Sequence, residues 1–360
     1  MSKVVILDCN DYEAVEDKVN RAFEEFPRQW SGKKVLVKPN MLSNHPPKRA
    51  ITTHPSIVSA VTKWLLGAGA DVTVGDNPSS TGRGENERCA RESGIADAAL
   101  GCYRNISNNG VAIEVNSRFT NQLVVSREVL EADVLVSLPK FKTHALTQIT
   151  GAIKNMYGIL VGGEKPRMHA VAGGYRNFVE ALVDIYQIRP PDLTIMDAVV
   201  GMEGNGPSAG KPRQIGKIMA SDNGVALDAV MVTMMGKRPR KIHLLKIAEE
   251  RGLGQIDVSK LDIVGELEIL KKFRMPSTFL CHVFGGLANN RLAGSLVRRK
   301  PAVLADKCES CEICVKSCPV EAMSIDDKIP AIDRDACIEC YCCQELCPSN
   351  AIDLRRRVRG

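Results

Sequence analysis

Two copies of one cysteine pattern lie within the last sixty residues of this chain. In each copy three cysteines are spaced two residues apart, a fourth follows after three more residues, and a proline comes directly after it. The copies are Cys308, Cys311, Cys314 and Cys318 with Pro319, and Cys337, Cys340, Cys343 and Cys347 with Pro348. A [4Fe-4S] cluster needs four thiolates around one compact body, and this spacing wraps a short loop that brings three sulfurs together. The pattern therefore predicts two [4Fe-4S] clusters.

The fourth cysteine of each copy is predicted to bind the cluster of the other copy, as in the bacterial C-x2-C-x2-C-x3-C-P run. Cluster I then takes Cys308, Cys311, Cys314 and Cys347, and cluster II takes Cys337, Cys340, Cys343 and Cys318. Each proline has a fixed φ and no N–H, so it turns the chain away from the metal. Residues 319–325 also align with residues 348–354 as an internal repeat. The segment resembles the bacterial-type ferredoxins over its whole length, which implies electron transfer.

Cys342 lies between two predicted ligands but is out of register with the first copy, so we interpret it as a thiol beside cluster II. The competing interpretations of the motif are a zinc ribbon and a disulfide scaffold. Zinc sites usually have two separated cysteine pairs, and disulfide-dense chains are small and secreted. Triplets with a distant fourth thiolate in a chain of 360 residues argue against both.

The other four of the thirteen cysteines, Cys9, Cys89, Cys102 and Cys281, are scattered, which favours a reducing compartment. The apolar run at the N-terminus is far shorter than a signal-peptide core, and no eighteen uncharged apolar residues run together. We therefore expect a soluble, cytoplasmic protein without a membrane span. Accessible cubane clusters are oxygen-sensitive, which favours an anaerobic or microaerobic setting.

The net charge of +6 conceals an asymmetry along the chain. Residues 301–354 carry four Lys or Arg against eleven Asp or Glu, whereas residues 1–300 carry forty against thirty-one. An acidic module on a basic body favours either docking between the two or a basic cleft for an anionic substrate. The sequence argues against nucleic-acid binding, because aromatic residues make up only 4% and stacking platforms are scarce.

The first 250 residues alternate β-branched runs with amphipathic stretches, which is typical of a mostly parallel sheet covered by helices. The predicted strands are residues 4–7, 34–37, 71–74, 112–115, 123–125, 134–138, 193–196, 217–220 and 261–264. The predicted helices are residues 14–26, 56–66, 83–93, 175–188, 224–235 and 242–250, the second of them capped by Thr53 or His54. We expect an α/β domain over residues 1–265, a basic connector over 266–300, and a small α+β ferredoxin-like domain over 301–360.

Polar residues braced by Pro or Gly follow four of the predicted strands, in segments 38–40, 75–78, 139–144 and 197–207. Ligands of parallel α/β sheets bind outside the carboxyl ends of the strands. Each segment alone fits ordinary turn chemistry. The four in succession predict a single binding site.

The basic residues of these segments point to recognition of phosphate or carboxylate. Thr147, Thr150 and Lys154 have the spacing of one helical face. The sequence leaves open whether the carboxylates accept a proton, bind a divalent ion or pair with the lysines, and each lysine has a solvated surface charge as its alternative. The predicted catalytic residues are Lys140, Lys142, His144, Lys154 and Asp197. The predicted substrate-binding residues are Lys38, Asn40, His54, Asp76, Asn77, Thr150, Asn155 and Glu203.

The fingerprints of common cofactors are missing from the sequence. No GxGxxG follows a strand, and residues 201–207 match neither that pattern nor a GxxxxGK[ST] loop. Whether a flavin or a divalent metal joins the clusters is left open. Paired glycines bracket residues 164–172, which we interpret as a mobile loop.

These segments resemble a large bacterial and archaeal family, domain of unknown function 362, whose members are often fused to a C-terminal ferredoxin module. The resemblance rests on residues 38–40, 53–55, 75–76, 139–144, 151–158, 197, 201–207, 220–222 and 226–228. It covers about residues 1–240. The resemblance implies that the strand-end segments form one site, and it names no reaction or substrate.

The sequence favours a ferredoxin-type oxidoreductase that passes electrons through two clusters, from a redox partner, to an anionic small molecule in the α/β domain. The effective concentration of a fused donor is high. One alternative is an electron-transfer module that docks a partner redox enzyme. Another is a polyanion- or nucleotide-binding protein in which the clusters are structural.

Overall fold

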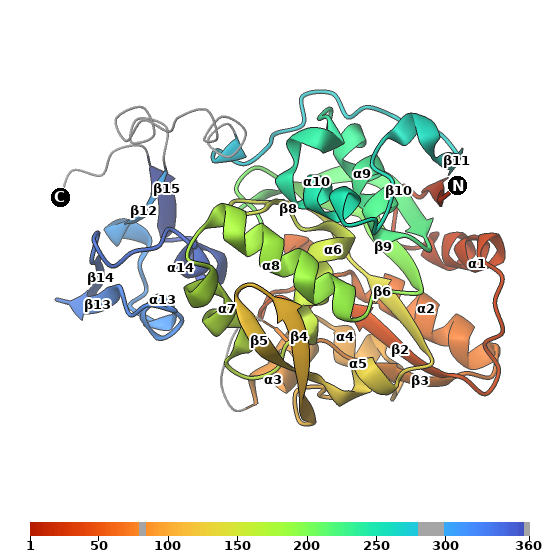
Figure 1. Cartoon of the computed structure of the whole chain (residues 1–360), viewed down its shortest axis with the longest axis horizontal. Helices are drawn as coiled ribbons and strands as arrows, with labels where there is room; N and C mark the ends of the chain where they lie inside the picture. Colours follow the sequence, from red (N-terminus) through yellow and green to blue (C-terminus); the bar gives the residue numbers. More distant parts are fainter. Residues whose placement is uncertain (79–83, 280–298, 356–360) are drawn as a thin grey trace.

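A computed structural model describes residues 1–78, 84–279 and 299–355 of the chain. A large body of helices around a sheet holds both the N-terminus and the middle of the chain (Figure 1). The cysteine-rich segment forms a small domain at one side of this body, with one of its helices facing it (Figure 1). The predicted boundaries of the domains stay a prediction, since residues 280–298 of the basic connector lie outside the described residues.

A nine-stranded mixed sheet runs through the described part of the body. Its strands are β1 (Lys3–Asp8), β2 (Lys34–Pro39), β3 (Asp71–Val74), β6 (Val134–Leu138), β7 (Lys140–His144), β8 (Gln148–Ile149), β9 (Leu193–Glu203), β10 (Lys211–Ser221) and β11 (Asp262–Val264). The order is β11-β1-β10-β9-β6-β2-β3, and β7 pairs with both β9 and β8. Five of the pairings are parallel, and those of β10 with β1 and β9 and of β7 with β8 are antiparallel. The predicted α/β class with a mostly parallel sheet is confirmed.

Both faces of the sheet are covered because its central strands are apolar on both sides. Leu36 and Leu135 pack into one hydrophobic cluster, while their neighbours Val35 and Val134 pack into the other. The first cluster receives α6 (Gly151–Asn155), α7 (Glu164–Ala172), α8 (Tyr175–Ile188), α9 (Gly224–Met234) and α10 (His243–Glu250). The second receives α1 (Val15–Glu25), α2 (Pro55–Gly67), α3 (Glu85–Glu92) and α4 (Ile95–Ala98).

The remaining elements of the body are short or lie outside the main sheet. A hairpin of β4 (Gly110–Ser117) and β5 (Thr120–Ser126) is followed by α5 (Arg127–Glu131). Short 3-10 helices are η1 (Pro47–Arg49), η2 (Met156–Ile159), η3 (Pro239–Lys241) and η4 (Val258–Lys260). His54 is the residue that caps α2, since its Nδ1 accepts the N–H of Ser56 at 3.2 Å.

Three expectations for local structure are wrong or incomplete. Residues 140–144, predicted as a strand-end loop, form β7, in which Lys140 is in register with Asp197 of β9. Residues 164–172, predicted as a mobile loop, form α7, which ends at Gly173 with φ 64°. Thr147 lies outside α6, so it does not share a helical face with Lys154. Arg83, the predicted start of α3, lies outside the described residues.

The small domain repeats its structure as it repeats its sequence. It contains β12 (Lys300–Val303), η5 (Ala305–Lys307), α13 (Ile313–Lys316), β13 (Met323–Asp326), β14 (Ile329–Ile332), α14 (Cys342–Leu346) and β15 (Ile352–Arg355). Its two antiparallel pairs are β12 with β15, which joins the two ends of the domain, and β13 with β14, which are consecutive strands. Among the described residues, no helix combines the length and apolar character needed to cross a membrane.

Candidate functional site

One pocket gathers eight of the thirteen predicted site residues, and we call it the lysine pocket. They come from the carboxyl ends of β2 and β3, from β7, and from the start and body of α6. The predicted residues that line it are Asn40, Asp76, Asn77, Lys142, His144, Thr150, Lys154 and Asn155. Three of the four predicted segments therefore meet, and the fourth contributes only Pro207 to the lining. The remaining lining residues are Met41, Leu42, Tyr157, Gly158, Lys165 and Glu345.

Two lysines of the pocket have ammonium groups held by backbone carbonyls. Lys142 is fully buried in β7, and its Nζ donates to the carbonyl of Ile51 at 2.7 Å. Lys165 of α7 donates to the carbonyls of Asn77 and, at 3.1 Å, of Pro78. Burial lowers the pKa of Lys142 to about 7 and that of Lys165 to about 8, because it penalises the charged form. Both side chains therefore change charge close to neutral pH.

Lys154 is the third lysine, and it lies over aromatic rings. Its Nζ is 5.1 Å from the ring centre of Tyr157 and 5.9 Å from that of Phe178. Burial lowers the pKa of Lys154, and the carboxylate of Glu345 opposes this shift. Cation-π contact and a nearby carboxylate are what keep a buried ammonium group charged.

Glu345 of α14 brings a carboxylate from the cysteine-rich domain into the pocket. Its Oε2 lies 3.5 Å from Nε2 of His144, and both side chains are buried. The Nδ1 of His144 accepts the N–H groups of Leu146 at 3.1 Å and Thr147 at 3.3 Å, so the ring proton belongs on Nε2. Burial, followed by the charge of Lys154, lowers the pKa of His144 to about 4. Burial opposes ionisation of Glu345, but Lys154 and His144 outweigh it and lower its pKa.

A buried ion pair between Lys38 and Asp76 lies at the wall of the pocket. Nζ of Lys38 lies 2.6 Å from Oδ1 of Asp76, whose other oxygen accepts the N–H of Met41 at 2.8 Å. Gly158 packs directly on this pair, because a Cβ there would come within 2.1 Å of Asp76 Oδ1. Only glycine permits this approach. Lys38 therefore lies behind the pocket wall and is neutralised there.

A second predicted pair, Lys140 and Asp197, is not brought into the lysine pocket. The two groups are 2.6 Å apart and essentially unexposed, and Tyr12 hydroxyl lies 2.9 Å from the ammonium group and 3.1 Å from Asp197 Oδ1. His54, predicted to bind substrate, stacks on the Tyr12 ring at 3.5 Å and donates its backbone N–H to Asp197 at 2.8 Å. Burial lowers the pKa of His54 to about 4. These four residues satisfy one another and brace β7 against β9.

Glu203 also lies apart from the pocket. It pairs with Arg213 at 2.6 Å and accepts the backbone N–H of Arg274 at 3.1 Å. It thus ties the end of β9 to the segment after β11. Among the described residues, no group of three or more His, Cys, Asp or Glu is arranged to hold a single metal ion.

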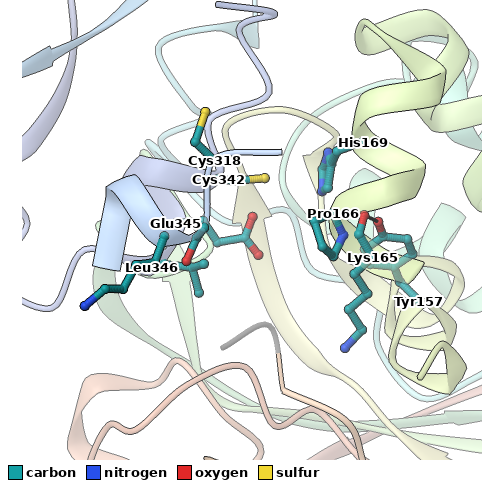
Figure 2. Close-up of a pocket in the computed structure, with 10 residues that line it drawn as sticks. Tyr157, Lys165, Pro166, His169, Cys318, Cys342, Glu345 and Leu346 are labelled. Atoms are coloured by element: carbon teal, nitrogen blue, oxygen red, sulfur yellow. Dashed lines mark hydrogen bonds between the residues drawn. The ribbon is translucent and has the colours of Figure 1, made fainter. Parts of the chain in front are cut away.

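The two domains share a second pocket, drawn in Figure 2, that adjoins the first. Tyr157, Lys165 and Glu345 line both. Its other walls are Pro166 and His169 from α7, and, from the small domain, Lys316, Ser317, Cys318, Cys342 and Leu346. Glu345 and Cys342 point from α14 toward the side that holds His169 (Figure 2). The lysine pocket thus continues into a space lined by one predicted ligand of cluster II.

The cysteine loops have a conformation that fits two clusters. The residues two and four places after the first cysteine of each copy, and three places after the fourth, have left-handed φ angles of 53–61° in both copies. These are Ser310, Glu312, Glu321, Glu339, Tyr341 and Asn350. Cys318 Sγ accepts the N–H of Ala322 at 3.2 Å, and Cys347 Sγ accepts that of Ala351 at 3.1 Å. Such N–H bonds to cysteine sulfurs are typical of iron–sulfur sites.

The neighbours of individual thiols agree with the predicted sharing of ligands. The cysteines whose charges act on Cys314 are Cys347, Cys311 and Cys308, the set predicted for cluster I. Those that act on Cys343 include Cys340, Cys337 and Cys318, the set predicted for cluster II, and also Cys314. The assignment of each ligand to its cluster stays a prediction. Cys342 is buried at the start of α14 and lies beside Cys340.

Comparison with known families decides where the chain belongs. Residues 35–233, more than half of its length, match the family described as domain of unknown function (DUF362). The chain is a member of the DUF362 family. Residues 307–351 match the 4Fe-4S dicluster domain. The predicted family and the predicted pair of [4Fe-4S] clusters are therefore confirmed: this DUF362 protein carries a dicluster electron-transfer module.

The DUF362 protein is similar to a protein of Synechocystis sp. that is described as thylakoid-associated. The two are 35% identical over 226 residues, which cover 62% of this chain and 69% of the relative. Among solved structures, the lactate racemase apoprotein of Thermoanaerobacterium thermosaccharolyticum aligns with a TM-score of 0.39 at 14% identity. A protein of Thermotoga maritima aligns with a TM-score of 0.39 at 12% identity. The alignments cover 63% and 71% of this chain and only 55% and 61% of those chains.

Sequence reasoning missed three polar side chains that line the lysine pocket, those of Lys165, Tyr157 and Glu345. The paired glycines on both sides of α7 disfavour a helix, so the sequence predicts a loop at Lys165. Tyr157 sits in a segment of η2 that carries no charge pattern. Glu345 lies between cysteines, where the metal motif explained the local sequence. No sequence signal separates Glu345 from the exposed acidic residues of the cysteine-rich segment, and its burial is seen only in the structure.

Proposed function

We propose that this chain is an iron–sulfur oxidoreductase that transfers electrons to an anionic small molecule held in the lysine pocket. The observation that carries the proposal is the shared wall between pocket and cysteine domain. Glu345, two residues after one predicted cluster ligand and two before another, lines the lysine pocket, and Cys318 lines the adjoining space. A predicted ligand of cluster II thus lines the space next to the proposed anion site.

The pocket residues supply binding, orientation and a proton. Lys142, Lys154 and Lys165 provide positive charge in a site from which water is largely excluded, where such charge acts strongly on an anion. The neutral imidazole of His144 presents its Nε2 proton as a hydrogen-bond donor. Lys142, with a pKa of about 7, is suited to donate a proton to a reduced substrate.

The clusters would be held by the eight motif cysteines and would supply one-electron transfers, two electrons when both are reduced. We further propose that electrons enter from the side of Cys311, because it is exposed whereas Cys343 is buried. This order assigns the outer position to cluster I and the position nearest the anion to cluster II. Lys140 and Asp197 then have a structural task, although the sequence predicted them to be catalytic.

The partner and the cellular setting of this redox protein are proposals as well. We propose a soluble electron donor that docks on the exposed face of the cysteine domain. The cytoplasmic location predicted from cysteine usage, and the oxygen-poor setting predicted from the sensitivity of the clusters, stay predictions. The thylakoid association belongs to the description of the Synechocystis relative.

Single-turnover reoxidation tests the proposed function. The holoprotein is reduced without oxygen, excess reductant is removed, and a panel of small carboxylates and phosphates is screened for the return of cluster absorbance. Lys154→Ala is expected to abolish acceleration by the active compound while the clusters remain intact. Lys211→Ala, at an exposed position of β10, is the matched control and should behave as wild type.

A carrier or a structural role would give a different result. If the protein only docks a partner enzyme, no small anion accelerates reoxidation and Lys154→Ala leaves transfer to the partner unchanged. If the clusters are structural, dithionite fails to reduce them. Either result would refute the proposal that the lysine pocket is an active site.

A further inference from the structure

The lysine pocket contains a carboxylate that belongs to the chain itself. The side chain of Glu345 is about nine-tenths buried, and its Oε2 lies 3.5 Å from His144 Nε2. The charges of Lys154, His144 and His169 all act on it. A glutamate from the cysteine domain thus reaches across the domain boundary into the part of the body where the predicted anion should bind.

Glu345 is the carboxylate left to balance the charge of the three lysines that line the pocket. Three lysines line the pocket, but Asp76 is its only other lining carboxylate among the described residues. Asp76 is engaged by Lys38 at 2.6 Å and by the N–H of Met41. The charge of Glu345 acts on Lys142, Lys154 and Lys165 together. Without it, the pocket would hold uncompensated buried ammonium groups, which is unfavourable.

We infer that the substrate anion of this pocket is a carboxylate, and that Glu345 occupies its position as an internal mimic which the substrate displaces. The inference rests on the proposed function and narrows its substrate class. The pocket already holds a carboxylate, rather than another anion, next to His144 Nε2 and within the influence of the Lys154 charge. A substrate carboxylate in the same position would meet the same donors.

Displacement of the Glu345 carboxylate does not require the domains to separate. The backbone carbonyl of Glu345 accepts the hydroxyl of Ser208 at 2.6 Å, and Gln344 Nε2 donates to the carbonyl of Asn205 at 3.1 Å. These bonds hold α14 in place independently of the carboxylate. The carboxylate itself is only at the outer limit of hydrogen-bond distance from His144. Rotation of one side chain therefore frees the position while the helix stays docked.

Acetate binding to the anaerobic holoprotein tests the inference. Glu345→Ala removes the internal carboxylate and leaves room for a small one. By calorimetry, acetate is expected to bind this variant at least roughly tenfold more tightly than wild type, because it no longer competes with a buried like charge. Gln344→Ala is the matched control, since it removes an interdomain bond and keeps the carboxylate, and it should bind acetate as wild type does.

The outcomes separate the inference from its alternatives. Equal acetate affinity in wild type and Glu345→Ala would overturn it, as would equally tight binding of inorganic phosphate to the variant. Enhanced binding in Gln344→Ala would show that loosened docking, and not the carboxylate, controls access. If Glu345→Ala loses its clusters, Glu345→Ser also removes the carboxylate and leaves room for acetate, and unchanged acetate affinity there refutes the inference.

The inference and the proposed function can fail separately. Tight acetate binding to Glu345→Ala combined with no reoxidation by any carboxylate would leave the mimic standing and would refute the oxidoreductase. If a phosphate compound reoxidised the clusters in a Lys154-dependent way and acetate did not bind, the oxidoreductase would stand and the carboxylate mimic would be refuted.

Discussion

Replacement of Lys140 by Met tests whether the Lys140–Asp197 pair braces the sheet. The ammonium group lies 2.6 Å from the carboxylate, with 1% and 0% of the two side chains exposed. Methionine keeps most of the volume of lysine but removes its charge. Asp197 would then be a fully buried carboxylate without a counter-ion, which costs about 3–5 kcal/mol when one partner of a buried pair is removed.

The geometry places the expected cost near the lower end of this range. Asp197 keeps three donors in the variant: the hydroxyl of Tyr12 at 3.1 Å, the N–H of His54 at 2.8 Å and that of Val199 at 3.3 Å. We therefore expect a loss of about 3 kcal/mol, which lowers the melting temperature of a domain of this size by roughly 6–12 °C.

Tryptophan fluorescence is the assay, because it reports on the body alone. The two tryptophans of the chain, Trp30 and Trp64, lie in one hydrophobic cluster with Phe23 between α1 and α2. Lys63→Met is the matched control. Its ammonium group is 2.6 Å from Glu16, the same separation, but both side chains are more than half exposed. Such a pair contributes less than about 1 kcal/mol.

A double variant decides whether the charge itself is the cause. Adding Asp197→Asn to Lys140→Met removes the stranded carboxylate, so the double variant should lose less stability than the sum of the two single losses. The argument that this buried pair is structural would be refuted if Lys140→Met melted at the same temperature as Lys63→Met. It would also be refuted if the double variant lost as much stability as the two single variants together.

Three further predictions follow from the site. Gly158→Ala would place a Cβ 2.1 Å from Asp76 Oδ1, so its tryptophan-monitored melting temperature should fall by roughly 5 °C or more, and an unchanged value would contradict the close packing. Lys142 and Lys165 have pKa values lowered by burial to about 7 and about 8, so anion affinity by calorimetry should be greatest below pH 7 and fall as pH rises through 7–8; a flat profile would contradict these shifts. Cys342→Ala should retain about eight irons per chain by iron analysis, and a loss of about four irons would show that Cys342 is a cluster ligand.

The cysteine domain could be predicted because its ligands are local in sequence. A short C-x-x-C-x-x-C loop brings its sulfurs together by itself, and the family match to a dicluster domain confirms the interpretation. The ends of β2 and β3 were predicted for a related reason. Val35 and Val72, in β-branched runs, mark the buried strands, and the residues after them must lie at the carboxyl edge of a parallel sheet.

The remainder of the site depends on contacts between distant residues. Lys140, Lys142 and His144 give residues 140–144 a polar sequence that predicts a loop, and only pairing with β9 makes this segment a buried strand. The sequence could not tell that the charge of Lys140 is neutralised by Asp197. It likewise could not place Glu345, since its partners lie in another domain.

The central claim is that a carboxylate in the lysine pocket lies next to the cluster-bearing segment. Electron–nuclear double resonance on reduced Glu345→Ala holoprotein with 13C-labelled acetate tests it most directly. The account predicts a 13C coupling to a reduced cluster that disappears when Lys154→Ala is added. Acetate that binds with measurable affinity but shows no coupling would contradict it, because the pocket would then lie too far from the clusters to receive their electrons.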